Sequence, residues 1–238
     1  MSPSEQKRAA AYAALDELPD EGIVGIGTGS TASYFIEGMA HLVRKGRKLV
    51  GVPTSFASRK LAEKEGIPLL SDEGPWQIDV TVDGADEVDR ELNLIKGGGG
   101  AHTREKIVNF ASKKNVIIVD ASKLSAYLGE RWSIPIEILP FAHKTVADQL
   151  SLYGKVALRE DRGTPARTDS GNYIYDLQTG PLVSSDRLIQ LERSLQAIPG
   201  VVETGLFLGR TDVLLVADSD GVRRESRPRS MPQPMVNY

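Results

Sequence analysis

Short runs rich in apolar residues alternate with helical patterns along the first half of the chain. Four such runs predict strands, at 22–29, where the strand runs into a glycine turn, and at 49–52, 78–83 and 116–119. The last of them is apolar throughout, as is typical of a strand covered on both faces. Helices are predicted over 4–18, 58–65 and 103–114, and over a stripe at spacings of three and four made by Ala32, Phe35, Ile36, Met39, Leu42 and Val43. This rhythm predicts an α/β fold with a doubly wound, Rossmann-like, mostly parallel sheet.

Beyond Trp132 the pattern changes to short strands joined by turns. Strands are predicted over 134–138, 155–159 and 173–177, and helices over 145–152 and 186–197. The turn at Ser170-Gly171-Asn172 is typical of antiparallel strands. These segments therefore predict a second, smaller α+β domain with an antiparallel, ferredoxin-like sheet.

The same patterns give the expected domain boundaries. The Rossmann-like domain is expected to take 1–130 and about 206–222, and the small domain 131–205. Two late runs, 201–208 and 212–217, are expected to pair as a hairpin through Gly209, or one or both to return to the first sheet. The segment 223–238 is rich in arginine and proline and has no periodicity, which predicts a mobile tail.

Composition and charge remove several classes of protein. The chain has 238 residues with 29 basic and 32 acidic side chains, so its formal net charge is 29 − 32 = −3. The absence of cysteine excludes a disulfide scaffold, a thiolate zinc site, an iron–sulfur cluster and a cysteine nucleophile. The near-neutral balance gives no reason to expect a nucleic-acid partner. Since no apolar run is long enough to span a bilayer, we expect a soluble, cytoplasmic protein without a membrane partner.

A glycine turn follows the first predicted strand, in the sequence Gly25-Ile26-Gly27-Thr28-Gly29-Ser30-Thr31. It is not a dinucleotide fingerprint, because position 30 is serine and no acidic residue ends the next strand. A P-loop is excluded as well, because no Gly-Lys-Ser/Thr follows. Two interpretations remain open: a loop that binds an oxyanion at a helix N-terminus, or a tight turn capped by Ser30 or Thr31.

An acidic run follows the third predicted strand, in the sequence Asp83-Gly84-Ala85-Asp86-Glu87-Val88-Asp89. Its spacing is not that of a calcium loop, and no histidine lies near it in the sequence. The run is thus either a solvated turn or part of a site. Its position favours a site, because ligands gather at the carboxyl ends of the strands in open α/β sheets.

A third segment holds four consecutive glycines, Gly97–Gly100, between Lys96 and a predicted helix. Such a loop is costly in conformational entropy, which indicates that its backbone N–H groups serve a ligand. Glu105 lies in the first turn of the helix, either as a functional carboxylate or as an ordinary acid favoured by the helix dipole. We expect His102 on the surface, and Ile107, Val108 and Ala111 on the inner face of the helix.

Together these loops resemble the type A ribose-5-phosphate isomerases. The matching segments are GIGTGSTA (25–32), PTS (53–55), TVDGADEVD (81–89), LIKGGGGAHTREKIV (94–108), VDASKL (119–124), IPIEILP (134–140), TDSGNYIYDL (168–177) and IPGVVETGLF (198–207). Each motif alone is modest, but their order and spacing together are specific. The resemblance departs at Gly100, where alanine is more common, and at His102, where an apolar residue is more common.

The resemblance implies a role for each matching residue. It implies that Glu105 is the proton-abstracting base and that Asp83 and Lys96 take part in catalysis. It implies substrate binding by Thr28, Gly29, Ser30, Thr31, Asp83, Gly84, Ala85, Asp86, Lys96, Gly97, Gly98, Gly99 and Lys123. The resemblance implies that the reaction needs no cofactor and no metal, and that the protein is a homo-oligomer, at least a dimer.

The implied reaction is the reversible isomerisation of ribose 5-phosphate and ribulose 5-phosphate through an enediolate, a step of the pentose phosphate pathway. It needs a base, donors for the developing oxyanion and an anchor for the phosphate. Two alternatives are a non-catalytic phosphosugar-sensing module and an isomerase of another sugar phosphate. A nicotinamide-dependent oxidoreductase is a further alternative, which Ser30 and the missing ribose-binding acid make less favourable.

Overall fold

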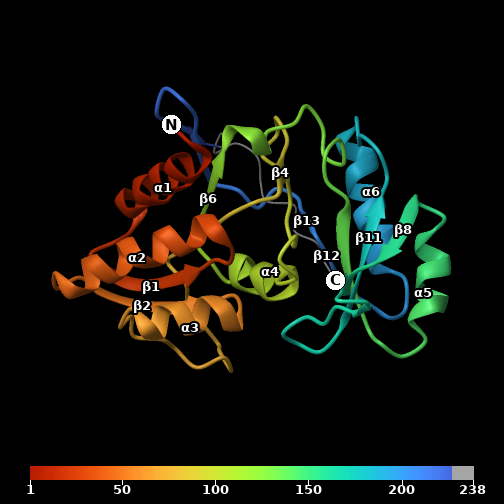
Figure 1. Ribbon diagram of the computed structural model, residues 1–238, viewed down its shortest axis with the longest axis horizontal. Coiled ribbons are helices and arrows are strands. Elements are labelled where there is room, and N and C mark those ends of the chain that lie inside the picture. Colours follow the sequence, from red (N-terminus) through yellow and green to blue (C-terminus); the bar gives the residue numbers. More distant parts are fainter. Residues whose placement is uncertain (227–238) are drawn as a thin grey trace. The chain divides into compact units, whose positions relative to one another are not determined.

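A computed structural model describes residues 1–226 of the chain (Figure 1). The chain divides into two compact units. Unit 1 comprises residues 1–85, 104–123 and the described residues from Gly209 onward, and unit 2 comprises 86–103 and 124–208. Among the described residues, no helix is both long and apolar enough to cross a membrane.

Unit 1 is built on a six-stranded sheet in the order β15-β14-β6-β3-β1-β2. Its strands are β1 (Glu21–Ile26), β2 (Lys48–Pro53), β3 (Val80–Asp83), β6 (Asn115–Asp120), β14 (Val213–Ala217) and β15 (Val222–Ser226). The first five pair in parallel, and β15 adds to β14 in the antiparallel sense. The predicted doubly wound sheet is thus confirmed. Strand β6 is buried at every position, as its unbroken apolar run predicts.

Helices pack against both faces of this sheet. They are α1 (Pro3–Ala13), α2 (Ser30–Arg44), α3 (Phe56–Lys64) and α4 (His102–Phe110), with short 3₁₀ turns η1 (Ala14–Glu17) and η2 (Ala121–Lys123). Val24 and Ile26 of β1 belong to one core, together with Phe35 and Met39 of α2. On the other face Ile23 lies in a second core with Val108 of α4. Figure 1 shows α1 beside α2, as their contacts require.

Helix α4 differs from its prediction in length and in its buried face. It ends at Phe110 rather than at Lys114. Val108 is buried and Ala111 packs against the same core, as expected, but Ile107 is 54% exposed. The apolar stripe is narrow because α4 meets the sheet over Gly25, where a Cβ atom would lie only 2.7 Å from Val108 Cγ1. The inward placement of Ile107 was therefore wrong.

Unit 2 holds a four-stranded antiparallel sheet in the order β12-β7-β11-β8, as predicted. Its strands are β7 (Ile134–Ile138), β8 (Lys155–Leu158), β11 (Tyr173–Gln178) and β12 (Val201–Thr204). Helices α5 (His143–Leu150) and α6 (Ser185–Gln196) contribute Leu150, Leu188 and Leu195 to a core with Ile136 and Ile138. Smaller sheets join β9 (Glu160–Asp161) to β10 (Thr164–Pro165), and β13 (Leu206–Phe207) to β5 (Leu94–Ile95) and β4 (Glu87–Val88).

The boundary between the units differs from the expected one. Residues 86–103 were assigned to the Rossmann-like domain, but the structure groups them with unit 2. The reason is strand pairing, because β5 pairs with β13 and β4 rather than with the six-stranded sheet. Of the two alternatives for 201–208 and 212–217, the hairpin was wrong, and the return of one run to the first sheet is confirmed. Strand β12 pairs with β7, while β14 returns to the first sheet beside β6.

The expected tail needs a correction at its start. Residues Val222–Ser226 form β15, paired along its whole length with β14. The sequence VRRES concealed this strand because an exposed edge strand needs no apolar face and is held by backbone hydrogen bonds. The rest of the expected tail, 227–238, lies outside the described residues.

Candidate active site

The loop Thr28–Thr31, here called the hydroxyl loop, joins β1 to the N-terminus of α2. Gly29 caps the helix with φ of +104°, a conformation that favours glycine. Ser30 is exposed, and the Lys7 ammonium of α1 donates a hydrogen bond to its Oγ over 3.1 Å. Two hydroxyls, free helix N–H groups and a nearby cation form an arrangement that suits an anionic group. No motif singled out Lys7, which lies on a separate helix, α1.

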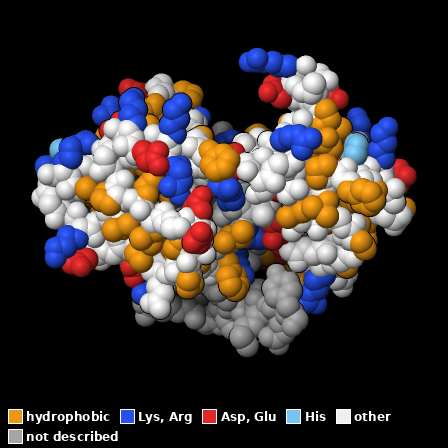
Figure 2. Space-filling view, turned by 90° about the horizontal axis from the view of Figure 1, so that it is seen from below, with side chains coloured by type: hydrophobic (Ala, Val, Ile, Leu, Met, Phe, Trp, Pro, Cys, Tyr) orange, Lys and Arg blue, Asp and Glu red, His pale blue; other side chains and the backbone are white. Residues whose placement is uncertain are grey.

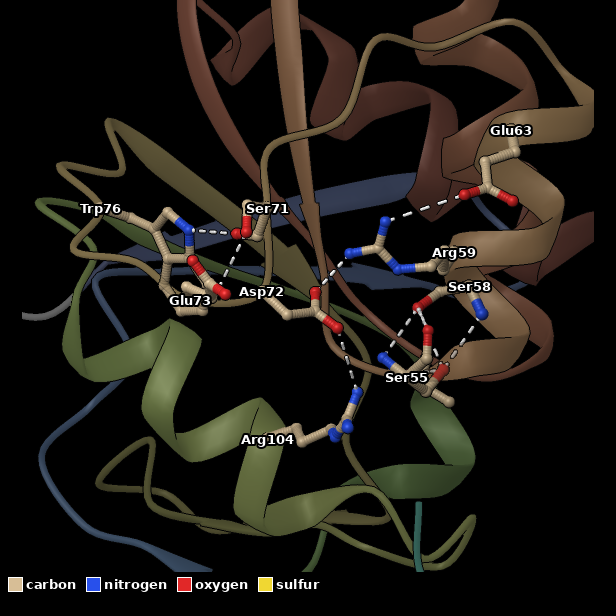
Figure 3. Close-up of polar contacts among 10 residues, drawn as sticks. Ser55, Ser58, Arg59, Glu63, Ser71, Asp72, Glu73, Trp76 and Arg104 are labelled. Carbon is tan, nitrogen blue, oxygen red and sulfur yellow. Dashed lines mark hydrogen bonds and ion pairs between the residues drawn. The ribbon is translucent and has the colours of Figure 1, made fainter. Parts of the chain in front are cut away.

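Thr28 links the hydroxyl loop to the end of β2. Its Oγ1 lies 2.8 Å from Thr54 Oγ1 and donates to Ser55 Oγ, also over 2.8 Å. Ser55 in turn caps α3 and exchanges hydrogen bonds with Ser58 (Figure 3). The Pro-Thr-Ser motif at 53–55 therefore fixes the position of Thr28, a function that its sequence alone did not reveal.

Asp83 ends β3 and is 3% exposed. Its Oδ1 accepts the N–H groups of Thr28 over 3.1 Å and Gly84 over 2.7 Å, and hydrogen bonds of this kind stabilise a carboxylate. The backbone of Gly27 passes directly beside this side chain. Asp83 thus ties the glycine turn after β1 to the acidic segment after β3, two loops predicted to lie at one edge of the sheet.

Glu105 lies in the first turn of α4 and is 5% exposed. An acid in this position is stabilised as a carboxylate by the helix dipole. Next to it in sequence, Arg104 stacks over the ring of Phe56, 4.5 Å from its centroid. Asp72 contacts both Arg104, over 3.8 Å, and Arg59 of α3 (Figure 3). These contacts hold the first turn of α4 beside the start of α3.

Lys123 ends η2, directly after β6. The turn is fixed by Asp120, whose Oδ1 accepts the N–H of Ser122 over 3.0 Å. Strands β1, β3 and β6 are parallel neighbours, so their carboxyl ends lie along one edge of the sheet. Unit 1 therefore brings to this edge the predicted residues Thr28, Gly29, Ser30, Thr31, Asp83, Gly84, Ala85 and Lys123.

In unit 2 the loop Lys96–Gly100, here called the glycine-rich loop, follows β5. The N–H of Lys96 donates to Gly205 O over 2.9 Å, and its ammonium lies 5.5 Å from the ring centroid of Phe207. The loop closes as a tight turn, in which the N–H of Gly100 donates to Gly97 O over 2.9 Å.

We predicted that His102 lies on the surface, but the structure buries it completely, with 0% of the residue exposed. Its Nε2 lies 3.3 Å from the carbonyl oxygen of Glu203. The ring occupies space that only glycine leaves open, because a Cβ atom on Gly97 would lie 2.6 Å from His102 Nδ1. The prediction failed because it assumed that the start of a helix is exposed and could not include the space beside Gly97.

Asp86 receives a hydrogen bond from the glycine-rich loop, since its Oδ2 accepts the N–H of Gly98 over 2.6 Å. The expectation that the amides of Gly97–Gly99 all serve a ligand is therefore corrected at Gly98. On the loop's carbonyl side, Arg159 Nη1 donates to Gly97 O and Gly98 O. Arg159 carries no motif in the sequence, and only the fold brings it here.

The other acids of the acidic run hold the protein's own backbone. Glu87 is fully buried and accepts hydrogen bonds from Ser125 Oγ over 2.6 Å and from the N–H of Gly129 over 2.8 Å. Burial raises the pKa of Asp89, which caps the turn to Asn93. Within residues 1–226, no three histidine, aspartate or glutamate side chains gather as a metal site.

Comparison with known proteins places the chain among one group. Residues 50–221 match the family of ribose 5-phosphate isomerase A (phosphoriboisomerase A). Ribose-5-phosphate isomerase A of Desulfatibacillum aliphaticivorans is 46% identical over 221 residues, covering 91% of this chain and 95% of that protein. The enzyme of Thermococcus kodakarensis is 41% identical, covering 95% and 100%.

Solved structures agree with these relatives. Ribose 5-phosphate isomerase A from Methanocaldococcus jannaschii superposes with a TM-score of 0.88 at 39% identity, covering 94% of this chain and 100% of that one. A D-ribose-5-phosphate isomerase in complex with phospho-erythronic acid gives a TM-score of 0.90 at 38% identity, covering 95% and 100%.

Proposed function

The chain belongs to the ribose 5-phosphate isomerase A family and is an aldose–ketose isomerase, and we propose that Glu105 is the base of its reaction. The observation that carries this proposal is a carboxylate buried to 5% exposure in the first turn of α4. The helix dipole favours negative charge at this position, and the burial of Glu105 limits competition from water.

In the proposed reaction the Glu105 carboxylate removes the proton from C2 of the open-chain aldose. The electron pair of that bond forms the C1–C2 double bond, and the carbonyl oxygen on C1 becomes the enediolate oxyanion. Protonated Glu105 then returns its proton to C1, while the proton of the hydroxyl on C2 passes to the oxygen on C1. The product is the 2-ketose, and no electron leaves the sugar.

The phosphate is assigned to the hydroxyl loop. Ser30 and Thr31 present hydroxyls at the N-terminus of α2, where helix N–H groups and the dipole favour an anion. Lys7, hydrogen-bonded to Ser30, supplies a positive charge. Local donors of this kind are needed because the formal net charge of the chain is −3, so its overall field does not attract an anion.

The remaining site residues are assigned to the sugar and its oxyanion. We propose that Lys96, Lys123 and the amide of Gly99 stabilise negative charge on the substrate, and that Asp83 and Asp86 hold its hydroxyls. Gly84 and Ala85 place the backbone between those two acids. The fixed position of Asp83, which accepts two backbone N–H groups, supports its role. An aspartate in contact with a ring hydroxyl is also suited to assist ring opening.

The proposal is tested by an isomerase assay with ribose 5-phosphate alone, in EDTA and without nicotinamide. Wild-type turnover under these conditions is expected, whereas a phosphosugar-sensing module would bind substrate without turnover. Glu105→Gln should keep the fold and lower kcat at least about 100-fold, because it removes a general base. Glu63→Gln, on the outer side of α3, is the matched control and should retain full activity. Normal turnover by a folded Glu105→Gln protein would refute the assignment of the base.

We further propose a cytoplasmic homo-oligomer, at least a dimer, that acts in pentose phosphate metabolism. Large apolar side chains on the surface support an oligomer, including Phe141 and Leu152 of unit 2, which are strongly exposed. Apolar side chains also lie between charged ones in the face shown in Figure 2. Light scattering at working concentration tests this, and a monomeric mass would contradict it.

A further inference from the structure

Arg159 follows β8 and stands between a carboxylate and the glycine-rich loop. Its Nε donates to Asp176 Oδ2 over 2.9 Å and its Nη2 to Asp176 Oδ1 over 2.5 Å, a two-point pair that fixes the guanidinium plane. The third nitrogen, Nη1, donates to Gly97 O over 2.8 Å and to Gly98 O over 3.1 Å. The Arg159 side chain is 20% exposed, so water competes little for these contacts.

These two contacts set the orientation of two successive peptide groups. In a planar trans peptide the N–H points opposite to the C=O. With both carbonyls turned to Arg159, the N–H groups of Gly98 and Gly99 must point away from it. Gly98 shows this directly, because its N–H meets Asp86 Oδ2 at 2.6 Å.

The N–H of Gly99 has the same orientation as that of Gly98, but its surroundings differ. The residue is exposed, and a Cβ atom built on it would meet no atom within 4 Å. Its N–H makes no hydrogen bond within residues 1–226. Since a run of glycines has little conformational preference of its own, the direction of this N–H depends on what holds the neighbouring carbonyls.

We infer that Arg159 is a positioning residue of the isomerase, which turns the peptide groups of the glycine-rich loop so that the Gly99 N–H donates to an anionic oxygen of the substrate. The inference rests on the proposed binding of substrate by this loop. Arg159 does not touch the substrate in this role, and acts through the carbonyls of Gly97 and Gly98. The anionic oxygen belongs either to the enediolate or to the phosphate.

The test replaces Arg159 by Met, which keeps an apolar stem of similar length and removes the donors. Arg159→Lys keeps the charge but loses the fork that serves Asp176 and both carbonyls, so it should restore activity only in part. Arg167→Met is the matched control, because Arg167, like Arg159, donates to a loop carbonyl, here Gly171 O over 2.7 Å. This control should leave activity unchanged.

We expect kcat/KM of Arg159→Met to fall by about 100-fold, the usual cost of one lost oxyanion donor. Affinity for phospho-erythronic acid should fall by a similar factor. Ribitol 5-phosphate has the phosphate but no carboxylate. It therefore distinguishes whether the Gly99 N–H binds the enediolate oxygen or the phosphate. An unchanged affinity for it assigns the Gly99 N–H to the reacting end of the sugar, and a parallel loss assigns it to the phosphate.

A readout independent of activity is the amide signal of Gly99 in 15N-labelled full-length protein. In Arg159→Met this signal should shift and exchange faster with solvent, while Asp176→Asn should give a smaller change of the same kind. An unchanged Gly99 signal together with unchanged ligand affinity would overturn the inference. If wild-type protein failed to isomerise ribose 5-phosphate, the proposed function would fail, whereas the Gly99 signal would still judge the role of Arg159.

Discussion

Gly27 lies so close to Asp83 that a Cβ atom on it would be 2.2 Å from Asp83 Oδ1 and 2.6 Å from the Cα atom of the same residue. The second distance involves backbone, so rotation of the Asp83 side chain cannot relieve the collision. The glycine turn after β1 thus serves an internal purpose. At Gly27 it leaves room for a carboxylate of the protein itself, which in turn holds the N–H of Thr28.

Gly27→Ala should therefore damage activity more than stability. The extra methyl group forces β1 and β3 apart at their carboxyl ends, at a cost of about 1–3 kcal/mol in the free energy of unfolding. Displacement of Asp83 by about an ångström should lower kcat/KM about 100-fold. Urea unfolding and steady-state kinetics measure the two effects.

The matched control for that variant lies on β1, the strand that precedes Gly27. A Cβ atom on Gly22 would lie 2.7 Å from Asp79 Oδ2, another carboxylate, at the opposite end of β1. Gly22→Ala should lose stability and keep its turnover per folded molecule. Equal loss of activity in both variants would show that the Gly27 effect is not local.

Lys7→Met should weaken substrate binding without slowing the chemical step. Loss of the cation beside Ser30 is expected to raise KM about 10-fold, corresponding to about 1.4 kcal/mol, at nearly constant kcat. The difference from wild type should shrink at high salt. Arg8→Met removes the adjacent cation, which lies over Tyr12 instead, and should change KM little. A fall in kcat with an unchanged KM would contradict a role at the phosphate.

Glu137 offers a test of the support behind Glu105. This acid of β7 is 1% exposed and accepts hydrogen bonds from Thr103 Oγ1 over 2.5 Å, Asn172 Nδ2 over 2.8 Å and Thr168 Oγ1 over 2.9 Å. Glu137→Ala removes the acceptor of one buried and two half-buried donors and should cost about 3 kcal/mol of stability. Because Thr103 precedes Glu105 by two residues on α4, kcat should fall as well. Glu137→Gln keeps one acceptor oxygen and should show a milder form of both effects in urea unfolding and kinetics.

The ion pairs of Glu17 predict how the free energy of unfolding changes at acid pH. The hydrogen bond from Arg224, and then that from Lys114, lowers the pKa of Glu17 below its usual 4.5. A carboxyl whose folded pKa is lowered stabilises the protein above its unfolded pKa and loses that contribution as the pH falls through the folded pKa. Arg224 is half-exposed, so the contribution is under about 1 kcal/mol.

The free energy of unfolding of Glu17→Gln should thus lie below that of wild type by a constant amount near neutral pH. Below pH 4.5 the two curves should converge. Glu225→Gln is the control, because Glu225 pairs with Arg223 on the exposed strand β15 and should give a smaller difference. A difference that grows on acidification would contradict this account.

The sequence pattern was sufficient for the parts of the fold with a regular period. The buried run of β6 and the apolar stripe of α2 identified their elements, and parallel order then placed Thr28 and Asp83 at one sheet edge. Elements without an apolar period were missed, above all β15, whose residues are all exposed. The burial of His102 was missed because it depends on the missing Cβ atom of Gly97, a property of two residues together.

Contacts between residues that are far apart in the sequence could not be predicted either. Arg159 and Gly97 are 62 residues apart, and Thr103 and Glu137 are 34 apart. An arginine at a strand end or a glutamate within an apolar strand has many possible partners, and only the pairing of β7, β8 and β11 selects these. Apart from Lys7, the residues that touch substrate in the proposal came from motifs, whereas most of the residues that hold them came from the fold.

Strand β15 also has a consequence for solubility during synthesis. Strand β14 is apolar and buried at all five positions. Without β15 it would be an exposed apolar edge strand, which can pair with strands from other chains. The five residues of β15 cover this edge and present two arginines and a glutamate to water in its place. A nascent chain released before Val222 would expose the apolar edge, so premature termination there should yield aggregates rather than a shortened enzyme.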